Sequence, residues 1–153
     1  MANPKETEAF DRNTRLAVFG RTAETGRVPS VLEIAEALAA PRGDVEESLR
    51  RLAAGRAIVL SPSGTGIWMA NPFSAVPTPF RVYANGRTYY GNCIWDALGI
   101  PASLGTDARI EAQCGDCGDP MTLEVRGGEV TAGDGIMHFG VPAARWWENI
   151  GYT

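Results

Sequence analysis

Three prolines crowded into residues 71–79 constrain the fold of this chain more than any other feature of its sequence. Pro72, Pro77 and Pro79 each fix their own φ angle and push the preceding residue away from the helical region. Apolar residues recur at helical spacing before this segment, and short alternating runs dominate after it. We therefore predict two units, residues 1–70 and 80–153, joined by a stiff, extended linker over residues 71–79.

The first unit has the pattern of three helices followed by a hairpin. Helical spacing predicts a first helix over residues 10–24, and Ser30 with Glu33 forms a capping-box signal ahead of a second. A third helix is predicted over residues 43–54, followed by a strand, a turn and a strand over residues 57–69. This order is typical of a winged helix-turn-helix domain.

The charge of this unit argues against nucleic-acid binding. The whole chain carries 14 basic and 18 acidic residues, for a net charge of −4. Asp44, Glu46 and Glu47 occupy the start of the would-be recognition helix, which would have to approach base edges. Phosphate contacts would lack a basic surplus. We expect the unit instead to cover the second unit or to support oligomerisation, for example as a homodimer.

The second unit has the pattern of a small sheet with one helix. Asn85-Gly86, between two short strand-like runs, is a strong signal for a β-hairpin. A helix is predicted to begin at Cys93, and strands are predicted over residues 108–114, 121–125 and 129–131. The expected fold class is α+β: a winged-helix-like three-helix domain with a hairpin, then a mostly antiparallel sheet core with a central helix.

Cys93 and Asp96 are the main candidate site residues. At the start of a helix they are one turn apart and share a face. The helix dipole favours the thiolate there, and a nearby carboxyl can deliver a proton to whatever the sulfur binds. In the alternative interpretation, Cys93 is a small buried apolar residue and Asp96 a charge that complements the helix dipole.

The same segment resembles a known family. Gly86-Arg87, the aromatic pair Tyr89-Tyr90, then Cys93-x-x-Asp96-Ala97-Leu98 and a second cysteine segment resemble the core of organomercurial (alkylmercury) lyases, over residues 79–153. The resemblance implies that thiolates hold the mercury of an organomercurial while the aspartate manages protons. Protonolysis of the carbon–mercury bond then releases a hydrocarbon and leaves Hg(II) bound. It assigns Cys93 as the first cysteine and Asp96 as the acid, with no resident cofactor required.

The resemblance also implies a second catalytic cysteine in a strand that follows a Trp-rich segment. The printed sequence has Trp146-Trp147 and ends at Thr153, about where that cysteine is expected. The sequence is therefore either that of a shortened relative or that of a chain printed without its tail. A single thiolate polarises the carbon–mercury bond less than two, so lyase activity would be impaired. Two other functions stay open: a non-enzymatic Hg or Cu binding protein, and a small-molecule enzyme that uses Cys93 and Asp96 as nucleophile and acid.

Cys114 and Cys117 form a C-x-x-C pair in a predicted turn between strands. Three interpretations are open: a zinc site, a reduced or structural pair, and participation in the mercury site as the second sulfur. A structural zinc needs four ligands, and Cys93 and His138 are the other soft candidates.

His138 and the tryptophan pair each allow two interpretations. His138 is predicted to lie in a strand over residues 136–139, as a hydrogen-bonded strand residue or as a ligand or proton shuttle. Trp146 and Trp147 are predicted on a short helix, where they close the core or provide an apolar wall for an organic substituent.

The cellular compartment is predicted from targeting and membrane-spanning segments and from cysteine usage. The N-terminus has no apolar signal segment, and no apolar run approaches the roughly 18 residues of a membrane span. An odd count of three cysteines, two of them in one C-x-x-C, favours reduced thiols over a disulfide framework. We expect a cytoplasmic protein that meets a small organomercurial or a soft metal ion together with external thiols, and no membrane.

Overall fold

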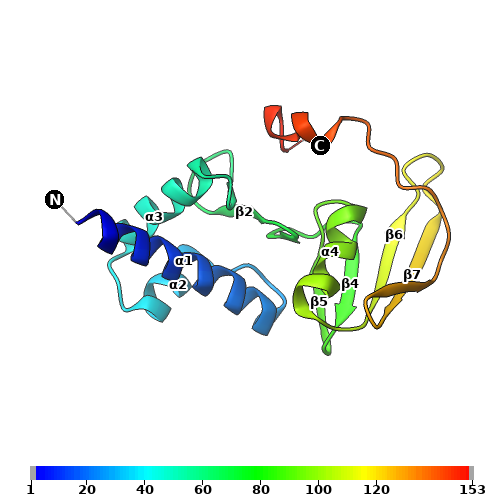
Figure 1. The fold of residues 1–153 in the computed structure, drawn as a ribbon, viewed down its shortest axis with the longest axis horizontal. Helices are drawn as coiled ribbons and strands as arrows, with labels where there is room; N and C mark the ends of the chain where they lie inside the picture. The colour runs from blue at the N-terminus through cyan, green and yellow to red at the C-terminus, as the bar shows by residue number, and fades with distance from the viewer. Residues whose placement is uncertain (1–2, 152–153) are drawn as a thin grey trace.

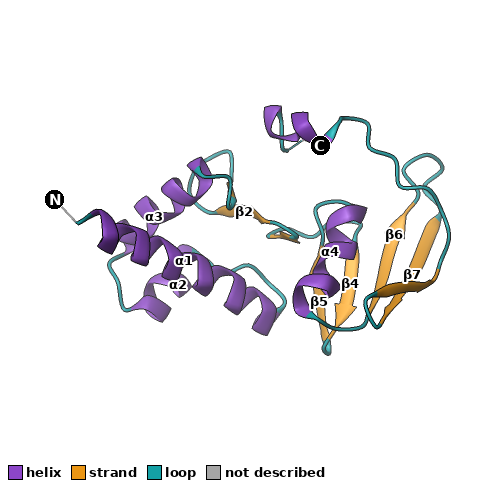
Figure 2. Ribbon diagram, viewed as in Figure 1, coloured by secondary structure: helices purple, strands orange, loops and turns teal. Residues whose placement is uncertain are grey.

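The computed structural model describes residues 3–151 and has an α+β fold, with a helical region followed by sheets (Figure 1, Figure 2). The helices are α1 (Pro4–Thr25), α2 (Val31–Leu38), α3 (Arg42–Ala54), α4 (Ile94–Leu104) and the 3₁₀-helix η1 (Ala143–Glu148). The strands are β1 (Val59–Leu60), β2 (Ile67–Ala70), β3 (Phe73–Ser74), β4 (Arg81–Ala84), β5 (Arg87–Tyr90), β6 (Ala108–Gln113), β7 (Pro120–Arg126) and β8 (Glu129–Ala132). The predicted α+β fold class is confirmed.

The first two helices begin at capping boxes. The predicted box at Ser30 and Glu33 is present, with each side chain bonded to the other residue's backbone N–H. α1 begins at Pro4, well ahead of the predicted start at residue 10, because Asn3 and Glu6 form a second capping box with proline at the first helical position. α1 thereby gains an extra stretch of polar helix.

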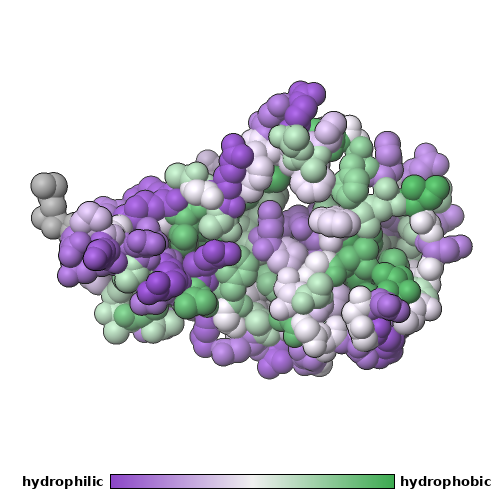
Figure 3. All heavy atoms as spheres, viewed as in Figure 1, coloured by the Kyte–Doolittle hydropathy of each residue, from purple (hydrophilic) through white to green (hydrophobic). Residues whose placement is uncertain are grey.

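The helical region has its own core. Buried apolar side chains from all three helices and the following hairpin meet there, and they include Val18, Ile34, Val45, Leu49 and Ile58. The outer faces of these helices are hydrophilic, as Figure 3 shows toward the N-terminal end of the molecule.

The proline-rich segment contributes more structure than a linker. β3 lies inside it and pairs antiparallel with β2, in a sheet of order β1-β2-β3. Phe73 of β3 is buried in the core of the second sheet, and its backbone forms an isolated bridge to Gly91.

The second sheet is antiparallel throughout, in the order β5-β4-β6-β7-β8. Its first hairpin turns at Asn85 and Gly86, whose φ angles of 52° and 72° suit the predicted two-residue turn. Arg81 of β4 pairs with Tyr90 on one side and with Glu111 on the other. The ends of β5 and β6 therefore lie at the same end of the sheet.

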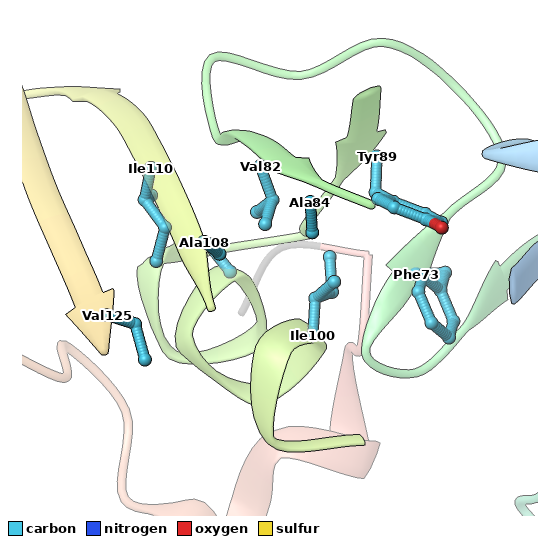
Figure 4. Close-up of a cluster of buried hydrophobic side chains, with 9 residues drawn as sticks. Phe73, Val82, Ala84, Tyr89, Ile100, Ala108, Ile110 and Val125 are labelled. Carbon is cyan, nitrogen blue, oxygen red and sulfur yellow. The ribbon is translucent and has the colours of Figure 1, made fainter. Parts of the chain in front are cut away.

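α4 covers one face of this sheet. Ile100 of α4 packs among Val82, Tyr89 and Ile110 from three strands, and all four side chains are fully buried (Figure 4). Burial of side chains of this size contributes about 1.5–3 kcal/mol each to folding. This packing fixes the axis of α4, and so the position of its first turn.

The helical region and the second sheet share an interface. Phe19 and Val28 pack against both cores. The hydroxyl of Tyr89 donates a hydrogen bond of 2.7 Å to the backbone carbonyl of Ala23, near the end of α1. Apolar packing and a part-buried hydrogen bond thus join the two regions.

The tail after β8 crosses the end of the sheet and returns to the helical region (Figure 1). Residues 133–139 form no strand, so the predicted strand over residues 136–139 is wrong. η1 then docks near β2 and α3: the Arg56 guanidinium lies 5.5 Å from the ring centroid of Trp147, and Gly151 packs on the ring of Trp68. No helix in the described part of the chain is long and apolar enough to cross a membrane.

Candidate active site

Gly91 sets the approach of β5 to the start of α4. A Cβ atom at this position would lie 2.6 Å from the backbone nitrogen of Ala97 and 3.0 Å from the carbonyl oxygen of Cys93. The backbone of Gly91 is also held, because its N–H donates to Phe80 and its carbonyl accepts a 2.6 Å hydrogen bond from the Thr78 hydroxyl. The sharp entry into α4 that follows makes Cys93 the N-cap residue, as the sequence predicts.

Cys93 and Asp96 line one cavity of about 400 Å³. Its walls come from the end of β2, the first turn of α4 and the tail. The lining residues are Met69, Asn71, Asn92–Asp96, Met137–Val141, Trp146 and Ile150. The two predicted site residues therefore face the same space, which is mostly apolar.

Asn92 holds the carboxyl of Asp96. Its side-chain amide donates to Asp96 Oδ2 at 2.9 Å and to Asn71 Oδ1 at 3.0 Å. Burial raises the pKa of Asp96 above its usual value, and the hydrogen bonds from Asn92 oppose this shift without cancelling it. The carboxyl thus retains a proton more readily than an ordinary aspartic acid does.

The thiol of Cys93 is half-buried, and burial raises its pKa. The backbone N–H groups of Trp95 and Asp96 oppose this rise, but neither forms a capping hydrogen bond with the sulfur. The start of α4 lowers the pKa of the thiol, as predicted, but desolvation raises it by more. The prediction of a favoured thiolate is therefore wrong, because the net shift of the Cys93 pKa is upward. In the unliganded protein, Cys93 favours the neutral thiol.

Aromatic rings form one wall of the cavity. Phe139 lies 5.9 Å from Trp95, edge to face, and 5.4 Å from Trp146, measured between ring centroids. The indole N–H of Trp146 donates to the carbonyl of Val141 at 2.8 Å, which secures the tail at this point. Neither Trp146 nor Trp147 belongs to a buried core, so their predicted core-closing role is not what the structure shows, and Trp146 instead lines the cavity.

Two soft side chains besides Cys93 reach the cavity. Met69 and Met137 line it with their flexible, polarisable side chains. His138 lines it as well, although the residue is largely exposed. The described residues contain no group of three or more His, Cys, Asp or Glu side chains arranged to hold a metal ion.

Cys114 and Cys117 lie elsewhere, in the predicted turn between β6 and β7. Neither residue lines the cavity. The structure thus brings Cys93 and Asp96 together and keeps the C-x-x-C pair apart from them.

A family model for alkylmercury lyase, MerB, matches residues 73–153, which is more than half of the chain. This chain belongs to the alkylmercury lyase family. Among solved structures, one described as the mercury-bound form of MerB2 matches with a TM-score of 0.63 and 23% sequence identity. The match covers 85% of this chain and 60% of that one, and it confirms a MerB-like fold. No curated protein sequence gives a significant match.

Sequence reasoning missed several residues that line this cavity. Asn92 could have been found, because an amide four residues ahead of a helical aspartate is well placed to bond it. Asn71, Met69 and Phe139 carried no local signal, since each reaches the cavity only through the tertiary fold.

Proposed function

We propose that this protein cleaves organomercurials, with Cys93 as the mercury ligand and Asp96 as the proton donor. The observation that carries the proposal is the presence of an N-cap thiol and a buried carboxyl in one largely apolar cavity of about 400 Å³. Membership of the alkylmercury lyase family supports it, as does the mercury-bound state of the structurally similar MerB2. The chain spans 60% of the length of that MerB2 structure.

The first step is the exchange of the mercury ligand. The Cys93 thiol releases its proton to solvent as its sulfur binds the mercury of R–Hg–X, and X leaves as an anion with the electron pair of the Hg–X bond. Hg(II) is a soft cation, so it favours thiolate over the oxygen and nitrogen groups of the cavity. The high thiol pKa is overcome at this point, because a bound metal cation stabilises the thiolate.

The second step is protonolysis. Asp96, whose pKa is raised by burial, takes up a proton from solvent and delivers it to the carbon attached to mercury. The electron pair of the carbon–mercury bond goes to the new carbon–hydrogen bond, and Hg(II) stays on sulfur. Asn92 keeps the carboxyl oriented during this transfer through its 2.9 Å hydrogen bond.

A second sulfur ligand would push more electron density onto the departing carbon. Within residues 3–151, Cys93 provides the only thiol that lines the cavity. The proposal therefore assigns the second sulfur to a small thiol from solution, which also removes the Hg(II) product.

A headspace assay tests this function directly. Phenylmercury acetate is incubated with the protein and excess glutathione, in a background in which Cys114 and Cys117 are both serine. We expect benzene release, which Cys93→Ser should abolish together with tight mercury binding. Asp96→Asn should still bind the organomercurial but release benzene about 100-fold to 10,000-fold more slowly, because it has no acidic proton. Undiminished release from either variant would refute the assigned role.

A second candidate function is soft-metal binding without cleavage. The observation in its favour is the presence of Met69 and Met137 beside Cys93, since thioethers and thiolates together select soft ions such as Cu(I). In this case, changing either methionine to leucine should weaken Cu(I) binding, and no variant should release benzene. Benzene release that depends on Asp96 would support the lyase function and exclude soft-metal binding without cleavage.

A further inference from the structure

The turn between β6 and β7 carries the two thiols that the Cys93 cavity does not use. The backbone N–H of Cys114 donates to the carbonyl of Asp119 at 2.9 Å and closes the hairpin. Within the turn, the N–H of Gly118 donates to the carbonyl of Cys114 at 3.0 Å, so residues 114–118 form a single helical turn. Gly118 ends this turn with a φ angle of +76°, which favours glycine.

This geometry places the two thiols together. Residues three apart on a helical turn lie on the same face, so the side chains of Cys114 and Cys117 are neighbours. Cys117 is exposed to solvent and Cys114 is partly exposed, so an ion can reach both sulfurs without opening the fold.

We propose that Cys114 and Cys117 form a second mercury site, which holds one Hg(II) between two thiolates outside the Cys93 cavity. Binding breaks the two S–H bonds, releases two protons to solvent and forms two S–Hg bonds. No electron is transferred, so the step needs no oxidant or reductant.

The ligand set fits Hg(II) better than zinc. A structural zinc ion takes four ligands, and no third His, Cys, Asp or Glu side chain completes a metal group around this pair in the described residues. Mercuric ion is satisfied by two thiolates, because it is soft and favours low coordination numbers. Asp116 and Asp119 add two carboxylates to a turn that contains no basic residue, and this charge favours a divalent cation.

The site lies at the same end of the sheet as Cys93. β5 leads into Cys93 and β6 leads into Cys114, and both strands finish at the same end of the sheet, separated only by β4. Because neither thiol of the turn lines the cavity, the turn can bind Hg(II) whether or not Cys93 is occupied.

Metal titration of a chain without Cys93 tests the proposal. The Cys93→Ser protein is titrated with mercuric chloride in the presence of glutathione, and native mass spectrometry and thiol counting follow the binding. We expect one Hg(II) per monomer and the loss of two free thiols. The matched controls add Cys114→Ser or Cys117→Ser to the same chain, and retention against glutathione should fall about 100-fold or more, because a one-thiol site loses the chelate advantage.

Four results would overturn the proposal. Consumption of one thiol per metal, or a mass that corresponds to two chains bridged by one Hg(II), would show that the turn does not chelate. Equal retention by the one-thiol controls would show the same. Tighter binding of zinc chloride than of mercuric chloride by the Cys93→Ser protein would reject the metal assignment. Circular dichroism of each variant confirms that the fold is intact, as expected for substitutions in a surface turn.

Discussion

Substitution of Gly91 by alanine should displace the first turn of α4 and with it the candidate site. The added methyl group would lie 2.6 Å and 2.9 Å from the backbone nitrogen and Cα of Ala97, and 3.0 Å from the carbonyl oxygen of Cys93. All three atoms belong to the backbone, so no side chain can rotate to make room. Overpacking of this kind costs about 1–3 kcal/mol. For a chain of this size, we expect the melting temperature to fall by about 2–12 °C.

Thermal unfolding followed by circular dichroism measures the loss of stability. Gly20→Ala is the matched control, because Gly20 is an exposed position in α1 with no atom within 4 Å of the added Cβ. That substitution should raise stability by about 0.5–1 kcal/mol, since alanine favours helix. In a background with serine at Cys114 and Cys117, Gly91→Ala should also change the reaction rate of the Cys93 thiol with a thiol reagent. An unchanged melting temperature together with an unchanged rate would refute the proposed role of Gly91.

Three further substitutions test the interface, the buried acid and the aromatic wall. Tyr89→Phe should cost about 0.5–1.5 kcal/mol of unfolding free energy, because a part-buried hydrogen bond is lost, whereas Tyr83→Phe, which removes an exposed hydrogen bond, should cost less. Asp96→Asn should raise stability at pH 7 by about 0.5–2 kcal/mol in thermal unfolding. Folding raises the pKa of the wild-type Asp96 carboxyl. The carboxyl therefore contributes its full stabilisation of the fold below pH 3.8, and this stabilisation is lost as pH rises through the folded-state pKa. Phe139→Ala should weaken phenylmercury binding about threefold to tenfold in calorimetry and methylmercury binding less.

One measurable outcome would contradict each of these three predictions. Equal losses for the two tyrosine variants would mean that the Tyr89 hydroxyl does not join the two regions. A stability difference for Asp96→Asn that stays constant from pH 4 to pH 7.5 would contradict a raised pKa. If Phe139→Ala weakened the binding of phenylmercury and methylmercury equally, the Phe139 ring would stabilise the tail without contacting the organic group.

Local signals in the sequence predicted local structure well. Asn85-Gly86 fixed a hairpin because few residue pairs adopt two successive positive φ angles. Ser30 with Glu33 fixed a helix start through reciprocal hydrogen bonds. Asn3, Pro4 and Glu6 carry the equivalent signal for the start of α1. Apolar periodicity alone predicts a later start, because the first turns of that helix are polar.

The sequence was less informative where tertiary packing decides. Residues 136–139 are apolar apart from His138 and predict a strand, yet they pair with no strand, and residues 137–139 line the cavity instead. A short apolar run shows only that a segment contacts an apolar surface, and a cavity wall satisfies that condition as well as a sheet does. The pKa of Cys93 was misjudged for a related reason, since burial is a property of the whole fold whereas the helix dipole can be inferred from a short segment.

The cavity draws its walls from three stretches of chain that are far apart in sequence: the end of β2, the start of α4 and the tail. The family match begins at residue 73, yet Met69 and Asn71 lie before it, and Asn71 accepts the hydrogen bond that helps to hold Asn92. The cavity therefore cannot be transferred with the matched segment alone. An exchange of residues 1–72 between two family members would replace part of the cavity wall as well. Under the proposed lyase function, substitutions at Met69 or Asn71 would alter which organic groups fit, even with every residue of the matched segment unchanged.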